Sequence, residues 1–370
     1  MVARLGLFCL MLLLSACDQA SESTGIQLNS ALGGMSAAGF ARAVEPRKFE
    51  FPADHAAHPE FRNEWWYITG HLQTETGRQF GYQVTFFRIA LSPKSPENAS
   101  RWATHQVWMA HLALTDVEGK QHLHEQRFAR GAAGLAGQQR QPFKVWLEDW
   151  QILGQAKGEF PWTVQVAHAD FSLQLNLQPQ KPAVLQGNQG LSQKSSEVGN
   201  ASYYYSFTRL ATTGSLHYQG QNFQVTGSSW LDREWSTSAL GKDQVGWDWF
   251  SLQLNAGQEL MFYQLRKTSG EADQLHSQGK WIAADASTCN LSLKDVELKP
   301  LKYWQARNGA QYPIAWELSY PAVDSHWRIE AVVEDQWMET SVLYWEGAVR
   351  VIDLKSGKRV GQGYLELSGY

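Results

Sequence analysis

Two segments of the sequence place carboxylic acids directly beside tryptophans. Residues 230–235 contain Asp232 and Glu234, and residues 246–254 contain Asp248. A carboxyl group surrounded by apolar side chains has a raised pKa, because desolvation disfavours its charged form. Such a group can donate a proton to a substrate near neutral pH. The pattern therefore predicts three candidate catalytic acids, Asp232, Glu234 and Asp248.

The segment around Asp248 is expected to be a strand, in which successive side chains point to opposite faces. Asp248 then shares a face with Phe250 and Leu252, while Trp247 and Trp249 lie on the other face. This places the carboxyl in line with apolar neighbours, as a general acid requires. The alternative is an aspartate at a strand end that faces solvent or an arginine.

The segment around Asp232 is also expected to be a strand. Asp232 and Glu234 then lie on the same face as Trp230, and Arg233 points the other way. Two carboxylates on one face can share a proton or a cation. The alternative is a structural network between Arg233 and carboxylates that closes one end of a barrel.

Further candidates for a binding pocket lie in two other predicted strands. Residues 63–67 place an acid against an aromatic cluster, and His111 lies inside the apolar run 108–114. A histidine within a strand can also be a core residue with its hydrogen bonds satisfied. The predicted ligand-binding residues are Glu64, Trp65, Trp66, Tyr67, His111, Trp230, Trp235, Trp247 and Trp249.

Several classes of chemistry lack their sequence signature. The chain has no Gly-x-Ser-x-Gly turn, no His-Glu-x-x-His or Cys-x-x-Cys pair and no phosphate-binding loop. We therefore predict no metal and no cofactor. The net charge is −4, with 18% charged residues, so no basic surface for nucleic acid is expected.

The segments that carry these residues are predicted to be strands along the whole chain. Apolar runs are separated by short polar turns that contain glycine, as at 75–78, 116–119, 255–257 and 308–309. Glycine supplies the positive φ that tight hairpins need. No apolar stripe of helical period persists. The sequence predicts an all-β protein of antiparallel barrels or sandwiches.

The first residues resemble a bacterial lipoprotein signal. Arg4 precedes an apolar run at 5–14, and the small residues Ser15 and Ala16 then precede Cys17. We expect cleavage before Cys17, acylation of that cysteine and a lipid anchor in the cell envelope, with the folded domains outside the cytoplasm. Asp18 hints at the inner membrane.

The composition after Cys17 changes with position. Residues 18–46 are rich in Ser, Ala, Gly and Gln and read as a flexible tether. Cys289 is then left alone in the mature chain, so no disulfide is expected. The rest of the chain is long enough for two domains.

The aromatic and acidic motifs follow one another in an order that resembles the AttH-like group of the carotenoid hydratase (CrtC-like) family. The resemblance covers nearly everything after residue 47. It implies two lipocalin-like antiparallel β-barrel domains in tandem, at 47–238 and 239–370. The residues that carry it lie at 63–70, 111–116, 230–235, 246–254, 344–349 and 363–370.

The resemblance also implies an activity. Carotenoid hydratases add water to an alkene at the end of a polyene, and members of the family are commonly labelled secreted hydrolases. That chemistry needs a desolvated acid and aromatic faces that stabilise a carbocation. Asp232, Glu234 and Asp248, with their tryptophan neighbours, are the residues that would supply these parts.

Three functions remain open from the sequence. The first is an acid–base enzyme acting on an apolar, terpenoid or lipid-like molecule, by hydration, isomerisation, cyclisation or hydrolysis. The second is a non-catalytic carrier that holds a lipid in a closed pocket. The third is a glycan-processing or glycan-binding protein whose exposed tryptophans stack on sugars. The oligomeric state is not predicted.

Overall fold

The computed structural model describes residues 37–97, 100–156, 159–238 and 240–370. Cys17 and most of the predicted tether lie outside the described residues. The described chain is built almost entirely of strands, together with the short 3-10 helices η1 (Ala53–His55) and η2 (Pro321–Val323). The all-β prediction is confirmed. In the part of the chain that is described, no helix is long and apolar enough to cross a membrane.

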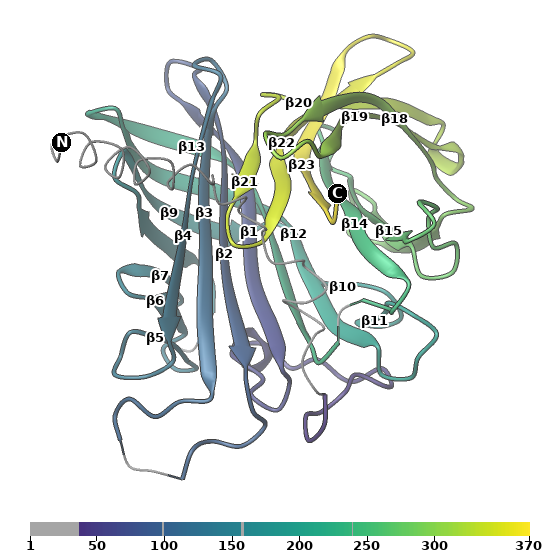
Figure 1. Cartoon of the computed structure of the whole chain (residues 1–370). Helices are drawn as coiled ribbons and strands as arrows, with labels where there is room; N and C mark the ends of the chain where they lie inside the picture. Colours follow the sequence, from purple (N-terminus) through teal and green to yellow (C-terminus); the bar gives the residue numbers. More distant parts are fainter. Residues whose placement is uncertain (1–36, 98–99, 157–158, 239) are drawn as a thin grey trace, which may run out of the picture.

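The first sheet is antiparallel and curls into a near-barrel (Figure 1). Its main path runs β4-β3-β2-β1-β13-β12-β9-β8-β7-β6-β5, and β10 and β11 pair with β12. Its strands are β1 (Asn63–Thr74), β2 (Gln79–Ala90), β3 (Gln106–Asp116), β4 (Gln121–Arg130), β5 (Ala136–Gln139), β6 (Lys144–Leu147), β7 (Trp150–Leu153), β8 (Trp162–Ala167), β9 (Phe171–Pro179), β10 (Val184–Leu185), β11 (Leu191–Gln193), β12 (Ala201–Tyr218) and β13 (Gln221–Ser236).

The second sheet is also antiparallel and curls into a half-barrel beside the first (Figure 1). Its path runs β17-β16-β15-β14-β23-β22-β20-β19-β18, and β21 pairs with β22. Its strands are β14 (Gln244–Leu254), β15 (Glu259–Lys267), β16 (Gln278–Ile282), β17 (Thr288–Ser292), β18 (Glu297–Gln305), β19 (Gln311–Tyr320), β20 (Ser325–Ala331), β21 (Trp337–Glu339), β22 (Leu343–Asp353) and β23 (Arg359–Ser368).

Side chains fill the interior of the near-barrel. Alternate residues of each strand point inward, as the period of two requires, and on β1 these include Trp66 and Ile68. The large indoles of Trp108, Trp150 and Trp162 pack with them and are fully buried. The inner face of the half-barrel holds a second core, around Phe250 and Trp345.

The outer faces of the two sheets pack against each other and form a third core, which includes Tyr67, Tyr204, Trp230 and Trp249. The approach of the sheets is close, because a Cβ added at Gly81 would lie 2.6 Å from the Cβ of Ala348.

Buried polar bonds also join the sheets. Gln253 Nε2 donates to the carbonyls of Thr208 and Ser229, at 2.8 and 3.0 Å. Glu259 is fully buried and is bound by Lys181 and Arg209 from the first sheet. These contacts hold the two sheets in a fixed relation, which positions the site between them.

Candidate active site

A cavity of about 410 Å³ lies between the outer faces of the two sheets. The first sheet supplies β1, β2, β3, β4, β12 and β13, and the second supplies β14, β15, β22 and β23. Most of the lining is apolar, with a few polar groups that converge on it. The lining residues are Trp65, Tyr67, Thr85, Phe87, Ile89, Leu91, Val107, Met109, His111, Phe128, Lys194, Tyr204, Asp232, Glu234, Leu240, Trp247, Trp249, Tyr263, Leu265, Ser341, Val342, Tyr344, Glu346, Glu366 and Ser368.

Many residues singled out in the sequence meet in this cavity. On β13, Asp232 and Glu234 line it, and Trp230 beside them donates from Nε1 to Asp232 Oδ1 at 2.7 Å. The other predicted residues that line it are Trp65, Tyr67, His111, Trp247 and Trp249. The cavity lies between the two barrels rather than inside either one.

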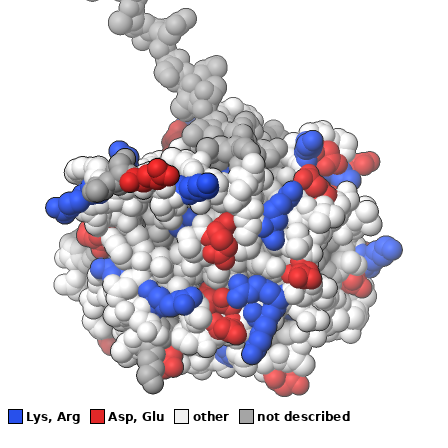
Figure 2. Space-filling model, turned by 90° about the horizontal axis from the view of Figure 1, so that it is seen from below, with Lys and Arg blue, Asp and Glu red and all other residues white. Residues whose placement is uncertain are grey.

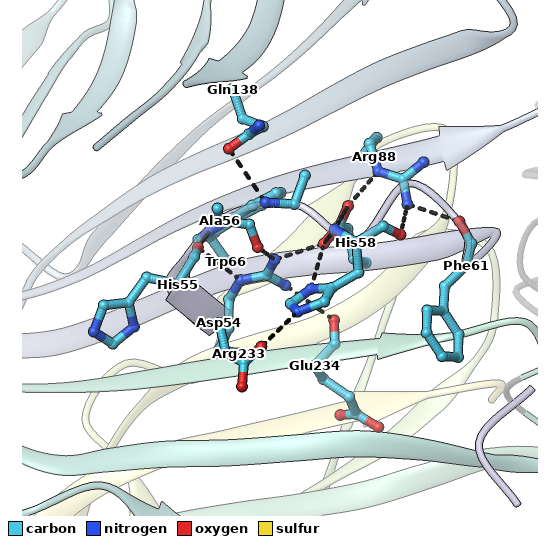
Figure 3. A network of polar contacts seen from close by, with 12 residues as sticks. Asp54, His55, Ala56, His58, Phe61, Trp66, Arg88, Gln138, Arg233 and Glu234 are labelled. Atoms are coloured by element: carbon cyan, nitrogen blue, oxygen red, sulfur yellow. Dashed lines mark hydrogen bonds and ion pairs between the residues drawn. The ribbon is translucent and has the colours of Figure 1, made fainter. Parts of the chain in front are cut away.

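Glu64 does not line the cavity and shares the inward face of β1 with Trp66, close to Arg88 and Arg233, which Figure 3 shows. There it pairs with Arg88 and, at 2.5 Å, with Arg233. Burial alone would raise the pKa of Glu64, but the two guanidinium groups outweigh it and hold that pKa well below its usual range. Glu64 is therefore a structural ion-pair residue, and the predicted arginine–carboxylate network exists with Glu64 as its acid.

Trp66 and Trp235 belong to the same interior. The Arg233 guanidinium lies 3.7 Å from the centre of the Trp66 ring, and the His58 ring stacks on Trp235 at 3.7 Å. Both indoles are fully buried in the barrel core. Neither can touch a ligand in the cavity.

Asp248 also lies outside the cavity, because the face it shares with Phe250 and Leu252 is the inner face of the half-barrel. It pairs with Arg266 at 3.2 Å and accepts hydrogen bonds from Tyr370 Oη and Gln264 Nε2 at 2.6 and 3.1 Å. Burial raises the pKa of Asp248, against the opposing effect of Arg266. The carboxyl is thus desolvated as predicted, but it is fully partnered and remote from the indoles of Trp247 and Trp249.

Asp232 is held at the cavity wall by a set of donors. Tyr204 Oη donates to Oδ2 at 2.6 Å, Ser206 Oγ and Trp230 Nε1 donate to Oδ1, and Trp249 Nε1 donates to Tyr204 Oη. Burial raises the pKa of Asp232 to about 7, although the three hydrogen bonds oppose it. The group can therefore exchange a proton near neutral pH.

Glu234 has a different partner from its neighbour. Its Oε1 lies 3.3 Å from Lys194 Nζ and accepts a hydrogen bond from Ser202. Burial lowers the pKa of Lys194, but Glu234 and Tyr263 raise it by more, so the ammonium is retained. The Lys194 ammonium therefore lies at the cavity wall, where it is paired with the Glu234 carboxylate.

Two further acids face the cavity from the second sheet, and the sequence analysis did not select them. Glu346 on β22 and Glu366 on β23 are directly paired across the strands. Burial, together with the Glu366 charge, raises the pKa of Glu346 well above its ordinary value. Burial raises the pKa of Glu366 to about 7, although Trp247 Nε1 donates to it at 2.8 Å.

The surroundings of Glu346 are unlike those of the other acids. The residue is 2% exposed, and its neighbours are the hydroxyls of Tyr67 and Tyr344, which oppose the rise in its pKa without reaching ideal hydrogen-bond geometry. Burial, together with the nearby Glu346 charge, raises the pKa of the Tyr67 hydroxyl well above its ordinary value. A buried carboxyl of this kind is rare without a functional reason. A usable signal existed in the sequence, since Glu346 interrupts an apolar strand.

A chain of hydrogen bonds orients the Tyr344 hydroxyl beside Glu346. The backbone N–H of Ser341 donates to Gln126 Oε1 at 3.0 Å, so the Gln126 Nε2 group faces His111 Nε2, at 2.8 Å. An amide nitrogen can only donate, so the proton of the neutral imidazole lies on Nδ1. His111 Nδ1 then donates to Tyr344 Oη at 2.6 Å.

Because the Tyr344 hydroxyl accepts this bond, its own proton can turn toward the nearby Glu346 carboxyl. Burial lowers the pKa of His111 to about 3, which keeps the ring neutral. Among the described residues, no group of three His, Cys, Asp or Glu side chains is arranged to hold a metal ion.

Comparison with known proteins places this geometry in context. A model of the AttH-like family matches residues 42–370. A solved structure of a Nitrosomonas europaea protein described as an AttH is 34% identical, with a TM-score of 0.79, and the alignment covers 90% of this chain and 100% of that one. No functionally curated protein matches the chain.

Two more distant structures share the fold. Kievitone hydratase from Nectria haematococca is 15% identical, with a TM-score of 0.62, and the alignment covers 90% of this chain and 98% of that one. CghA in complex with Sch210972 is 13% identical, with a TM-score of 0.53 and the same coverage of 90% and 98%. At these identities the similarity establishes the fold alone. The tandem lipocalin-like architecture expected from the sequence is confirmed.

Proposed function

We propose that this chain, which belongs to the AttH-like family, binds an apolar, terpenoid or lipid-like molecule between its two sheets. We propose further that it transfers a proton to that molecule. The reaction class that fits is hydration or isomerisation of a carbon–carbon double bond. The cavity of about 410 Å³ falls within the usual range for small-molecule sites. Kievitone hydratase, which shares the fold, is by its name a hydratase.

The observation that carries the proposal is the Glu346 carboxyl. It is buried, lines a largely apolar cavity and is paired with no cation in the described part of the chain. Burial and the neighbouring Glu366 raise its pKa, so it carries a proton at neutral pH. A carboxylic acid kept neutral in an apolar site is able to protonate a substrate.

The reaction can be written with these groups. The Glu346 O–H bond breaks as its proton adds to one alkene carbon, and the positive charge on the other carbon lies among the rings of Tyr67, Trp247 and Trp249. A water molecule then adds to that carbon and loses a proton to the Glu346 carboxylate, which restores the acid. In an isomerisation, a neighbouring C–H bond supplies that proton instead.

The four cavity acids also bear on the alternatives. A carrier needs the apolar cavity but has no use for Asp232, Glu346 and Glu366, the three acids at its wall whose pKa values are raised. The glycan interpretation expects exposed, coplanar indoles, whereas Trp230 and Trp249 are 2% and 7% exposed with their rings at 85°. An apolar substrate is therefore the better match.

The first experiment identifies the ligand. Protein purified from its own membranes is extracted with solvent, and native mass spectrometry records any bound mass. With that compound as substrate, Glu346→Gln should bind normally and lose turnover by about 100-fold or more. Asp248→Asn is the matched control, because its carboxyl lies outside the cavity, and it should keep turnover. Full activity in Glu346→Gln, or binding without turnover in the wild type, would reject the enzymatic proposal and leave the carrier.

We also propose that the protein is a lipoprotein of the cell envelope, anchored through acylated Cys17. The support is the apolar run followed by Ser15, Ala16 and Cys17. Labelling of cells with a radioactive or clickable fatty acid should mark the wild type and not Cys17→Ser. A wild-type protein without label would remove the anchor from the proposal.

A further inference from the structure

We propose that the mouth of the cavity is a membrane-docking surface, whose apolar rim of Leu91, Trp102 and Phe128 enters the outer layer of a lipid bilayer. A ligand would then pass between the bilayer and the cavity without crossing water. The passage of a ligand rests on the proposed function. The docking rests only on the exposed apolar and basic residues around the mouth of the cavity.

The rim joins the cavity directly. Leu91 and Phe128 line the cavity and yet are 48% and 52% exposed. Trp102 is 57% exposed and lies on the loop between β2 and β3. The base of this loop is closed by a hydrogen bond from the Leu91 N–H to the His105 carbonyl, at 2.7 Å.

Exposed apolar groups gathered at one place indicate an interaction site. Tryptophan is the residue that prefers the boundary between headgroups and hydrocarbon. The occupant that suits such a rim, at the entrance of an apolar cavity, is therefore lipid.

Charges around the rim suit the headgroups of a bilayer. Lys94 and Arg101 are exposed on the same loop, and Arg130 is exposed at the end of β4, while Glu97 is the exposed acid of the described loop residues. Basic side chains next to an apolar rim attract anionic lipid headgroups. Figure 2 shows this lower end of the molecule, where charged side chains are separated by broad uncharged areas.

The start of the described chain lies beside the same loop. A Cβ added at Gly39 would lie 2.8 Å from Pro93, so the first described residues lie beside the loop that carries the rim. The chain between Cys17 and residue 37 can extend over at most about 70 Å. A lipid anchor on Cys17 would therefore keep the folded part near the bilayer but would not fix its orientation. The apolar rim would then determine which face of the protein contacts the bilayer.

The test measures depth in the bilayer at defined positions. The full chain, with the exposed Cys289 replaced by serine, is reconstituted into vesicles of phosphatidylethanolamine and phosphatidylglycerol. An environment-sensitive fluorophore is attached in turn at Trp102→Cys, Phe128→Cys and the control Leu301→Cys, which is 42% exposed on β18. Nitroxide-labelled lipids should quench the first two probes several-fold more strongly than the control.

Equal quenching at all three positions, or none at 102 and 128, would overturn the docking. If mass spectrometry finds Cys17 unmodified, the anchor has failed separately, and a histidine tag bound to nickel-chelating lipid holds the chain for the same measurement. Size-exclusion chromatography with light scattering tests the other occupant. A dimer that Trp102→Glu dissociates would assign the rim to a second copy and reject the membrane.

A second arm separates docking from ligand binding. Uptake of parinaric acid, a fluorescent polyene fatty acid, is followed from vesicles and from dilute detergent. The variant Trp102→Glu, at a rim residue that does not line the cavity, should slow uptake from vesicles several-fold and leave uptake from detergent unchanged. If the wild type takes up no parinaric acid from either source, the result counts against the proposed apolar ligand. The quenching measurement then decides the docking by itself.

Discussion

Glu64 and Glu346 are both buried glutamates on strands, yet their surroundings shift their pKa values in opposite directions. Two arginines beside Glu64 favour its charged form, and no cation approaches the carboxyl of Glu346 within hydrogen-bond distance among the described residues. Burial acts on both in the same sense. The partner, rather than the depth of burial, therefore decides which of the two is a structural ion and which can be an acid.

Glu366→Gln should make stability less sensitive to pH. The folded protein keeps a proton on Glu366 up to about pH 7, whereas the unfolded chain loses it near 4.5, so this group's contribution falls as pH rises between these values. The full shift corresponds to about 3 kcal/mol, and because Glu366 is partly exposed to solvent we expect a measured effect of about 1–2 kcal/mol.

Denaturant titrations at several pH values measure this effect. The variant should gain stability over the wild type as the pH rises through this window, and little difference should remain near pH 4. A variant that is less stable than the wild type at about pH 8 would contradict the raised pKa.

His111 should stay neutral, with its proton on Nδ1, throughout the range in which free histidine titrates. Burial lowers its pKa to about 3, and Gln126 fixes the tautomer. Nitrogen-15 NMR of the imidazole rings reads both properties directly. Gln126→Glu replaces the donor by an acceptor of the same shape, so it should move the proton to Nε2 or protonate the ring. An unchanged spectrum in that variant would contradict the hydrogen-bond chain.

At the scale of the strand, alternation explains which of the predicted residues meet in the cavity and which do not. It correctly grouped Asp232 and Glu234 on one face of β13, opposite Arg233, and it correctly separated Asp248 from Trp247. A period of two fixes which side chains share a face, but it cannot tell which of the two faces a partner sheet will cover.

The apolar face of the Asp248 strand became the core of the half-barrel, and the face with the tryptophans became the wall of the cavity. The positions of Glu346 and Glu366 depend on the pairing of β22 with β23 and on the packing of two sheets that are far apart in the sequence. No local pattern contains that information. The turn glycines, in contrast, act locally, which is why the all-β architecture was predictable.

Glu64→Gln tests the network inside the near-barrel. The change removes the negative charge between Arg88 and Arg233, both fully buried. Leaving buried charges without their partner costs about 3–5 kcal/mol. Chemical denaturation should show a loss of this size at neutral pH. The loss should shrink in acid, because the stabilisation from the lowered pKa of Glu64 is complete above the unfolded pKa of about 4.5 and is lost as the pH falls from there toward the folded pKa. Ligand affinity of the folded variant should not change.

For the molecule as a whole, the buried contacts between the sheets predict cooperative unfolding. Glu259 receives Lys181 and Arg209 across the interface and is fully buried. Glu259→Ala should cost about 3 kcal/mol or more and should split a single calorimetric transition into two. Glu334→Ala, which removes a solvent-exposed pair with Lys302, is the control and should change stability by less than about 1 kcal/mol. Two transitions in the wild type would show that the interface does not couple the sheets.

The close approach of the sheets at Gly81 has an evolutionary consequence. Neither sheet encloses the cavity alone, so its capacity depends on how far apart the two sheets stand where Gly81 meets Ala348 and Tyr364. A larger residue at position 81 would push the sheets apart and change the room for a ligand, without changing which acids line the cavity. We expect related proteins to differ at this contact between the sheets, and therefore in the size of the ligand that they bind. We expect them to keep the same proton-transfer chemistry.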